Sequence, residues 1–223
     1  MPDGLEQRRF VRYPIQLPFL HTPKSAGHGR TEGGWTRNLS EGGACVELAE
    51  HLQSRMPLRV RLRSERGAIE AEAQVVWAGG SRLGDGGILH GVVFTQIAPE
   101  QLHALRDLIL IRGLVRQAGV RVLYEVTVTC QRRGESGPPL EGRTRDISRG
   151  GVLLRLPQVL PPGEALELTL HTPRGPLKAD GTVIWVAPPE GRTPGGPIRH
   201  GFQVTALDWS TVLSLGLVLA ESV

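Results

Sequence analysis

The chain has 223 residues, enough for one large domain or for two of about 100 residues each. Glycine and proline number 29 and 17 and aromatic residues make up only 4%, but valine, leucine and isoleucine are plentiful, which excludes a disordered chain. The net charge of +4 fits an anionic partner without requiring one.

Cysteine content and apolar stretches limit the class of protein further. Cys45 and Cys130 have no CxxC spacing and no clustered histidines, so neither a zinc site nor a disulfide framework is indicated. Cys45 lies in an apolar run, where we expect a buried, inert thiol. The start, MPDGLEQRRF, lacks the apolar core of a signal peptide, and no apolar stretch is long enough to cross a bilayer. We therefore expect a cytoplasmic protein without membrane insertion.

Taken in chain order, short apolar or alternating segments between Gly, Pro and Ser clusters predict five strands. These are residues 13–20, 44–49, 58–63, 71–78 and 90–97. A helical pattern follows at 99–117, where Leu102, Leu105 and Leu108 form an apolar stripe. The strands then recur at 123–130, 151–157, 166–172, 178–187 and 200–207. A shorter helix at 210–222 can be capped by Asp208 or Ser210.

This order recurs because the sequence is duplicated. RNLSEGGACVEL at 37–48 returns as RDISRGGVLLRL at 145–156, Trp77 returns as Trp185, and HGVVF at 90–94 returns as HGFQV at 200–204. The fold class predicted is mainly β, with two tandem small antiparallel β-barrels, each followed by a helix. We divide the chain into a first domain at 1–98, a connecting helix at 99–117 and a second domain at 118–223. Trp77 and Trp185 are expected in the cores, and His90 and His200 in turns.

The repeated phrase has the form Asn/Asp-x-Ser-x-x-Gly. Its residues are Asn38, Ser40 and Gly43 in the first copy, and Asp146, Ser148 and Gly151 in the second. The pattern fits an Asx-type turn before a strand, with glycine allowing a positive φ. It also fits a ligand site, since an amide or carboxylate can bind a base edge, a hydroxyl can donate, and glycine lets backbone N–H groups approach an anion.

Basic residues precede the first strand in the segment QRRFVR, which contains Arg8, Arg9 and Arg12. Such residues near a chain end can form a solvated arm that is free to move. Guanidinium groups are also well suited to phosphate and can stack on a purine. Combined with the polar turn, these arginines indicate a site for a nucleotide with two phosphates.

With both motifs in view, the first copy resembles a PilZ domain, the bacterial receptor for the second messenger cyclic di-GMP. The family's signature is RxxxR ahead of a β-barrel and then Asn/Asp-x-Ser-x-x-Gly, and Arg8 to Arg12 and Asn38 to Gly43 match it in order. The resemblance implies that Arg8 and Arg12, with Arg9 between them, hold phosphates and stack on guanine. It also implies that Asn38 reads the guanine edge, Ser40 hydrogen-bonds the ligand and Gly43 permits its close approach. No metal and no cofactor are implied.

The second copy departs from the signature. Arg121 aligns with Arg12, but Gln117 stands where the first copy has Arg8, and only a one-residue slip would bring Arg116 into place. We therefore expect a weakened or lost second site, formed at most by Arg116, Arg121, Asp146, Ser148 and Gly151. Alternatively, the barrel needs that turn regardless of any ligand.

Catalytic motifs are absent from the sequence, so we do not expect an enzyme. The favoured function is a non-catalytic receptor that binds cyclic di-GMP chiefly through the first domain and relays it by conformational change to an unidentified protein partner. The alternative is an adaptor or structural protein whose barrels hold protein partners and ignore the nucleotide. A homodimer stays open, and DNA or RNA is not expected as a partner.

Overall fold

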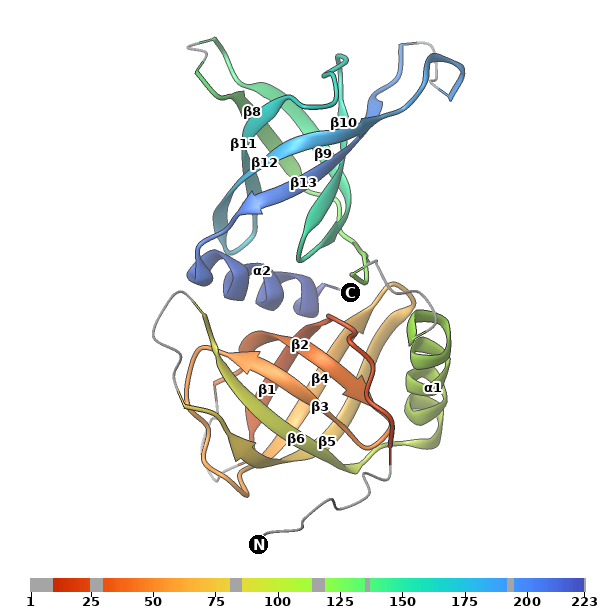
Figure 1. Cartoon of the computed structure of the whole chain (residues 1–223), viewed down its shortest axis with the longest axis vertical. Helices are drawn as coiled ribbons and strands as arrows, with labels where there is room; N and C mark the ends of the chain where they lie inside the picture. The colour runs from red at the N-terminus through yellow and green to blue at the C-terminus, as the bar shows by residue number, and fades with distance from the viewer. Residues whose placement is uncertain are drawn as a thin grey trace, which may run out of the picture.

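The computed structural model describes residues 10–24, 30–80, 86–113, 119–134, 137–191 and 195–222. It contains two antiparallel β-barrels stacked along the long axis of the molecule (Figure 1). One helix follows each barrel in the chain, which confirms the predicted fold class. Neither of these two helices is long and apolar enough to cross a membrane.

The first barrel closes in the strand order β1-β2-β3-β6-β5-β4, through pairing of β1 with β4. Its strands are β1 (Pro18–Pro23), β2 (Glu32–Ser40), β3 (Gly43–Leu48), β4 (Pro57–Ser64), β5 (Gly67–Ala78) and β6 (Ile88–Gln96). Alternate residues of β4 point inward, as expected for a sheet with one apolar face. Helix α1 (Pro99–Gly113) adds Leu105, Leu108 and Ile109 to the same core.

The second barrel has the order β10-β13-β12-β11-β8-β9 and closes by pairing of β9 with β10. Its strands are β8 (Thr127–Arg132), β9 (Leu140–Ser148), β10 (Gly151–Leu156), β11 (Ala165–Thr172), β12 (Gly175–Val186) and β13 (Ile198–Ala206). The short strand β7 (Val122–Leu123) adds to the edge of β9, and a 3-10 turn, η1 (Pro189–Gly191), follows β12.

Each barrel has one strand more than the sequence pattern predicted. The extra strands, β2 and β9, read EGGWTRNLS and LEGRTRDIS. Their glycines and polar residues hide the alternation that marks a strand, and both are interrupted by a β-bulge, at Arg37 and Arg145. The Asn/Asp and Ser of the repeated phrase therefore lie at the end of a strand, and only the two residues after the Ser form the turn.

Two expectations for aromatic residues were wrong. Trp77 and Trp185 are 39% and 42% exposed, and each covers a glycine of the neighbouring strand, Gly91 or Gly201, on the outer face of its barrel. A glycine on the next strand leaves room for the large indole to lie flat against the sheet.

His90 and His200 are fully buried in β6 and β13 instead of lying in turns. The Nε2 atoms accept hydrogen bonds from Leu52 N at 3.0 Å and Leu160 N at 3.1 Å. Both Nδ1 atoms lie within hydrogen-bond distance of a backbone carbonyl of the same strand. These histidines therefore satisfy backbone groups of the segment that follows β3 or β10, and burial lowers the pKa of His90.

Helix α2 (Trp209–Glu221) lies between the two barrels (Figure 1). It buries Val212, Leu215 and Leu219 in the core of the second barrel, in the same cluster as Trp35 of β2. The Trp35 indole Nε1 donates to the carbonyl of Val212 at 2.8 Å. The predicted cap is confirmed at Asp208, whose Oδ1 accepts from Thr211 N at 2.9 Å. The side-chain hydrogen bond from Thr211 is the main reason that the pKa of Asp208 falls to about 2.

Candidate ligand site

In the first barrel the repeated phrase forms the hairpin between β2 and β3. Ser40 pairs with Gly43 and Asn38 with Cys45, and the Ser40 hydroxyl donates to Gly43 O at 3.1 Å. A Cβ atom on Gly43 would collide with the carbonyl oxygen of Val92 in β6, so only glycine fits there. The hairpin thus packs closely against β6.

A strap formed by residues 10–17 crosses this hairpin. The ring of Phe10 lies against Gly42, where a Cβ atom would be 2.6 Å from it. Tyr13 exchanges two backbone hydrogen bonds of 2.9 Å with Leu39. The buried Thr36 hydroxyl donates to Ile15 O at 2.7 Å and accepts from Leu17 N at 2.8 Å. The sequence predicted a free arm through Arg12, but the structure anchors the chain on both sides of that residue.

The strap places Arg12 beside the hairpin. Arg12 is exposed, and it makes no ion pair with any residue that the structure describes. Cys45 is the cross-strand partner of Asn38. Burial raises the pKa of the Cys45 thiol, and the positive charge of Arg12 partly opposes this rise. The Asn38 Oδ1 atom is buried and has no hydrogen-bond partner among the described residues. Arg8 and Arg9 lie outside the described residues.

The second copy has the same arrangement of strap and hairpin. Val122 pairs with Ile147 as Tyr13 pairs with Leu39, which places Arg121 where the first copy has Arg12. The Arg121 Nη1 atom donates to Asp146 Oδ1 at 2.7 Å. The Ser148 hydroxyl donates to Gly151 O at 3.3 Å, and a Cβ on Gly151 would lie 2.7 Å from Phe202 O. Arg116 and Gln117 lie outside the described residues.

Other hairpins show what the Ser and Gly of the phrase do structurally. The hydroxyl of Ser64 donates to Gly67 O at 3.0 Å, and that of Thr172 donates to Gly175 O at 2.6 Å. Those hairpins, β4–β5 and β11–β12, have the same Ser/Thr-x-x-Gly spacing but no Asn or Asp two residues earlier. The hydroxyl–carbonyl contact is therefore a general hairpin contact of this chain, and the Asn or Asp distinguishes the candidate site.

Sequence reasoning missed Arg37, the bulged residue next to Asn38. Its Nη1 lies 3.6 Å from Oε2 of Glu47, a carboxylate of β3 that is only 9% exposed. Arg149, which follows Ser148 in the second hairpin, donates from its own Nη1 to the same oxygen at 2.8 Å. The second barrel thus contacts the first one next to the candidate site. The recurrence of Arg before the Asn or Asp, in RNLS and RDIS, was the available signal for Arg37.

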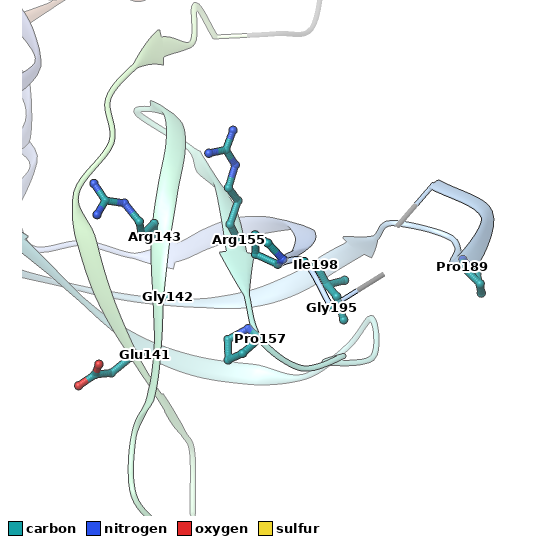
Figure 2. A pocket seen from close by; sticks show the side chains of 10 residues that line it. Glu141, Gly142, Arg143, Arg155, Pro157, Pro189, Gly195 and Ile198 are labelled. Carbon is teal, nitrogen blue, oxygen red and sulfur yellow. The ribbon is translucent and has the colours of Figure 1, made fainter. Parts of the chain in front are cut away.

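A large cavity lies elsewhere, on the second barrel. It has a volume of about 790 Å³ and is bordered by β9, β10, Pro189 and residues 195–198 (Figure 2). Arg143 and Arg155, a cross-strand pair, lie along one side of it, and Arg155 donates to Glu125 at 3.1 Å. None of the residues that line this cavity belongs to an Asn/Asp-x-Ser-x-x-Gly hairpin, so the cavity does not mark the candidate site.

Several solved structures are similar to this chain at low sequence identity. PlzA of Borreliella burgdorferi in complex with c-di-GMP is similar at a TM-score of 0.37 and 12% identity, over 93% of this chain and 94% of that one. The PilZ domain of Escherichia coli YcgR with c-di-GMP is similar at a TM-score of 0.40 and 18% identity, over 48% of this chain and 91% of that one. The Bacillus subtilis inhibitor of motility, MotI, is similar at a TM-score of 0.39 and 11% identity, over 92% of this chain and 94% of that one. No curated protein matches the sequence.

The decisive comparison is with protein-family models. The PilZ domain model matches the chain twice, over residues 6–110 and again over 115–212. Each match covers one of the two barrels and one copy of the repeated phrase. The two matches together take in most of the chain, and the protein therefore belongs to the PilZ domain family.

Proposed function

We propose that the protein is a non-catalytic receptor that binds cyclic di-GMP chiefly through its first domain, residues 1–98. The observation that carries this proposal is the pairing of two groups at the β2–β3 hairpin. One is the Arg12 guanidinium, which has no carboxylate partner among the described residues, and the other is the buried Asn38 oxygen, which has no hydrogen-bond partner there. A guanidinium suits a phosphate, and an amide oxygen can accept from the N–H groups of a guanine edge.

The remaining assignments follow from the family signature. Arg8 and Arg9 would add positive charge from the chain ahead of the strap, and Gly43 would allow the ligand close to the turn. Ser40 already donates its hydroxyl hydrogen to Gly43 O, so it would contact the ligand as an acceptor. Membership of a family of ligand-binding effectors, together with the absence of catalytic motifs in the sequence, supports a role other than catalysis.

The second domain, residues 118–223, is proposed as the weaker site. Its arginine, Arg121, already bonds Asp146 at 2.7 Å, so a phosphate would have to replace this contact. Arg116, Ser148 and Gly151 would complete that site. The region 99–117 would serve as the connecting helix between the domains.

The signal would be relayed to a protein partner through the junction of the barrels. Arg37 and Arg149 share one carboxylate oxygen of Glu47, so a ligand that attracted Arg37 would alter the charge balance of the junction. A ligand can shift such an arrangement only by its differential affinity for the two states. The alternative, an adaptor that ignores the nucleotide, is favoured only if no binding is detected.

The test is calorimetric titration of the full chain with cyclic di-GMP. Arg12→Ala should lower the affinity by roughly tenfold to more than a hundredfold, because a charge-assisted contact is worth about 1.5–3 kcal/mol. Asn38→Ala should cost less, about 0.5–1.5 kcal/mol. Arg121→Ala, at the equivalent position of the second barrel, is the matched control and should leave the main binding event unchanged. Parent-like binding by Arg12→Ala, or loss of binding in Arg121→Ala, would refute the assignment.

A further inference from the structure

A second group of polar side chains lies in the first barrel, outside the candidate ligand site. His21 of β1 pairs directly across the strands with Glu32 of β2, and Glu50 follows the end of β3. The His21 Nε2 atom lies 3.6 Å from Glu50 Oε1. One ligand atom from each residue lies within 4.8 Å of the other two. Three neighbouring strand ends therefore direct one imidazole and two carboxylates toward a common point.

The His21 imidazole is buried in the first barrel, where it stacks on the ring of Phe19 with the centroids 6.1 Å apart. His21 is 1% exposed, and neither of its ring nitrogens makes a hydrogen bond of good geometry with a described residue, although the Glu32 backbone lies close to the ring. Leaving buried polar atoms unpaired is costly, and such atoms in a native protein call for an explanation. Burial lowers the pKa of His21 to about 4, with the nearby charge of Glu32 opposing the shift and that of His90 adding to it. The neutral form of an imidazole offers one nitrogen lone pair to a metal ion.

The second barrel shows that the fold does not require these groups. Cys130 occupies the position of His21, and its cross-strand partner is Leu140 where the first barrel has Glu32. Both belong to, or pack against, the apolar core of the second barrel. Gln158 stands at the position of Glu50. A polar His–Glu–Glu set has thus replaced an apolar contact in one copy only.

We propose that His21, Glu32 and Glu50 bind a divalent transition-metal ion of the zinc type. Zinc takes imidazole nitrogen and carboxylate oxygen at about 2.0–2.2 Å, so tetrahedral ligand atoms lie roughly 3.3 Å apart, near the 3.6 Å between His21 and Glu50. Two carboxylates balance the charge of the ion, and the imidazole favours zinc over magnesium or calcium, which prefer oxygen ligands. A water molecule would fill the fourth position.

The ion would join β1, β2 and the end of β3 close to the junction of the barrels. Glu32 is followed by Gly33, where a Cβ atom would lie 2.6 Å from Leu217 of α2. A metal at this point would therefore fix the strand on which α2 rests. This role is independent of cyclic di-GMP and of the arginines that would hold it.

The experiment titrates the chelator-treated full chain with Zn²⁺ against a chromophoric chelator, with Co²⁺ absorption as a second readout. One ion should bind per chain at the proposed site. His21→Leu, which fills the buried space, should abolish this binding, and Glu50→Gln should weaken it at least tenfold. Because Glu50 is half exposed, its variant should fold normally and decides the matter if His21→Leu does not fold.

A matched control is His103→Ala, since His103 is an exposed histidine of α1 that lies 3.7 Å from Asp107 and could bind Zn²⁺ adventitiously. It should leave the affinity unchanged, and millimolar Mg²⁺ should not displace the Zn²⁺. The proposal is overturned if the parent binds no Zn²⁺, if Glu50→Gln binds like the parent, or if the binding disappears in His103→Ala.

Discussion

Replacing Gly216 by alanine tests whether α2 truly rests on the first barrel. Gly216 lies on the face of α2 that contacts β2, and a Cβ atom there would lie 2.7 Å from both Gly34 O and Trp35 Nε1. Helix and strand approach this closely because glycine stands on both sides of the contact. The strand side is Gly33, where an added Cβ atom would be 2.6 Å from Leu217 of α2.

The sign of the effect distinguishes this contact from helix propensity. In an exposed helix, Gly→Ala stabilises by about 1 kcal/mol. At position 216 the new methyl group meets backbone and a buried indole, which cannot swing aside, and overpacking of this kind costs about 1–3 kcal/mol. We therefore expect Gly216→Ala to lower the free energy of unfolding by about 1 kcal/mol, the opposite of the propensity effect.

The measurement is urea unfolding followed by tryptophan fluorescence, because Trp35 and Trp209 both lie at the junction. Ser214→Ala, a half-buried position of the same helix, is the matched control and should be neutral or slightly stabilising. If Gly216→Ala is as stable as Ser214→Ala or more so, the close packing of α2 on β2 is not present in solution.

Three further predictions concern the junction, the helix cap and the strap. Arg149→Ala and Glu47→Gln should show a coupling of about 1–3 kcal/mol in a double-mutant cycle of unfolding free energies, and additive effects would contradict the ion pair. The pKa of Asp208 is about 2 in the folded state, below its unfolded value of 3.8, so its stabilising contribution is complete above pH 4 and is lost as pH falls toward 2. Asp208→Asn should therefore make the free energy of unfolding depend less on pH in acid unfolding curves. Thr36→Val should cost about 1–3 kcal/mol of stability and weaken cyclic di-GMP binding, whereas the equivalent Thr144→Val should cost stability alone.

Much of the fold could be predicted because the sequence contains two copies of the same pattern of strands and motifs. The recurrence of RNLSEGG, Trp77 and HGVVF at nearly one spacing defines two copies, and the short alternating runs define strands. Strands β2 and β9 escaped prediction because their sequences lack that alternation. Strands β2 and β9 form because each pairs with a neighbouring strand on both sides. A local sequence pattern does not show such pairing.

Single residues were misplaced for a related reason. His90 precedes a glycine and so resembles a turn residue, yet its imidazole satisfies a backbone amide 38 positions away in the chain. Trp35 is a buried residue of β2 and would be expected in the core of the first barrel, but it packs with the apolar cluster of the second barrel. Contacts of this type depend on how two folded units meet.

The candidate site was found from sequence only in part for the same reason. The Asn/Asp-x-Ser-x-x-Gly phrase locates the hairpin, and the alignment of Arg121 with Arg12 agrees with the strand register. The role of Arg37 and the contact of Arg149 with Glu47 could not be read from either copy alone. They arise because the second hairpin meets the first barrel.

One position of the duplicated hairpin shows how the two copies diverged. The residue after the motif serine is Glu41 in the first copy and Arg149 in the second. Glu41 accepts from Arg106 of α1 at 2.8 Å, so the first hairpin is held by the helix that follows its own barrel. Arg149 instead donates to Glu47 of the other barrel. A reversal of charge at one site thus gives each copy of the same turn a different partner, and it makes the second hairpin part of the junction.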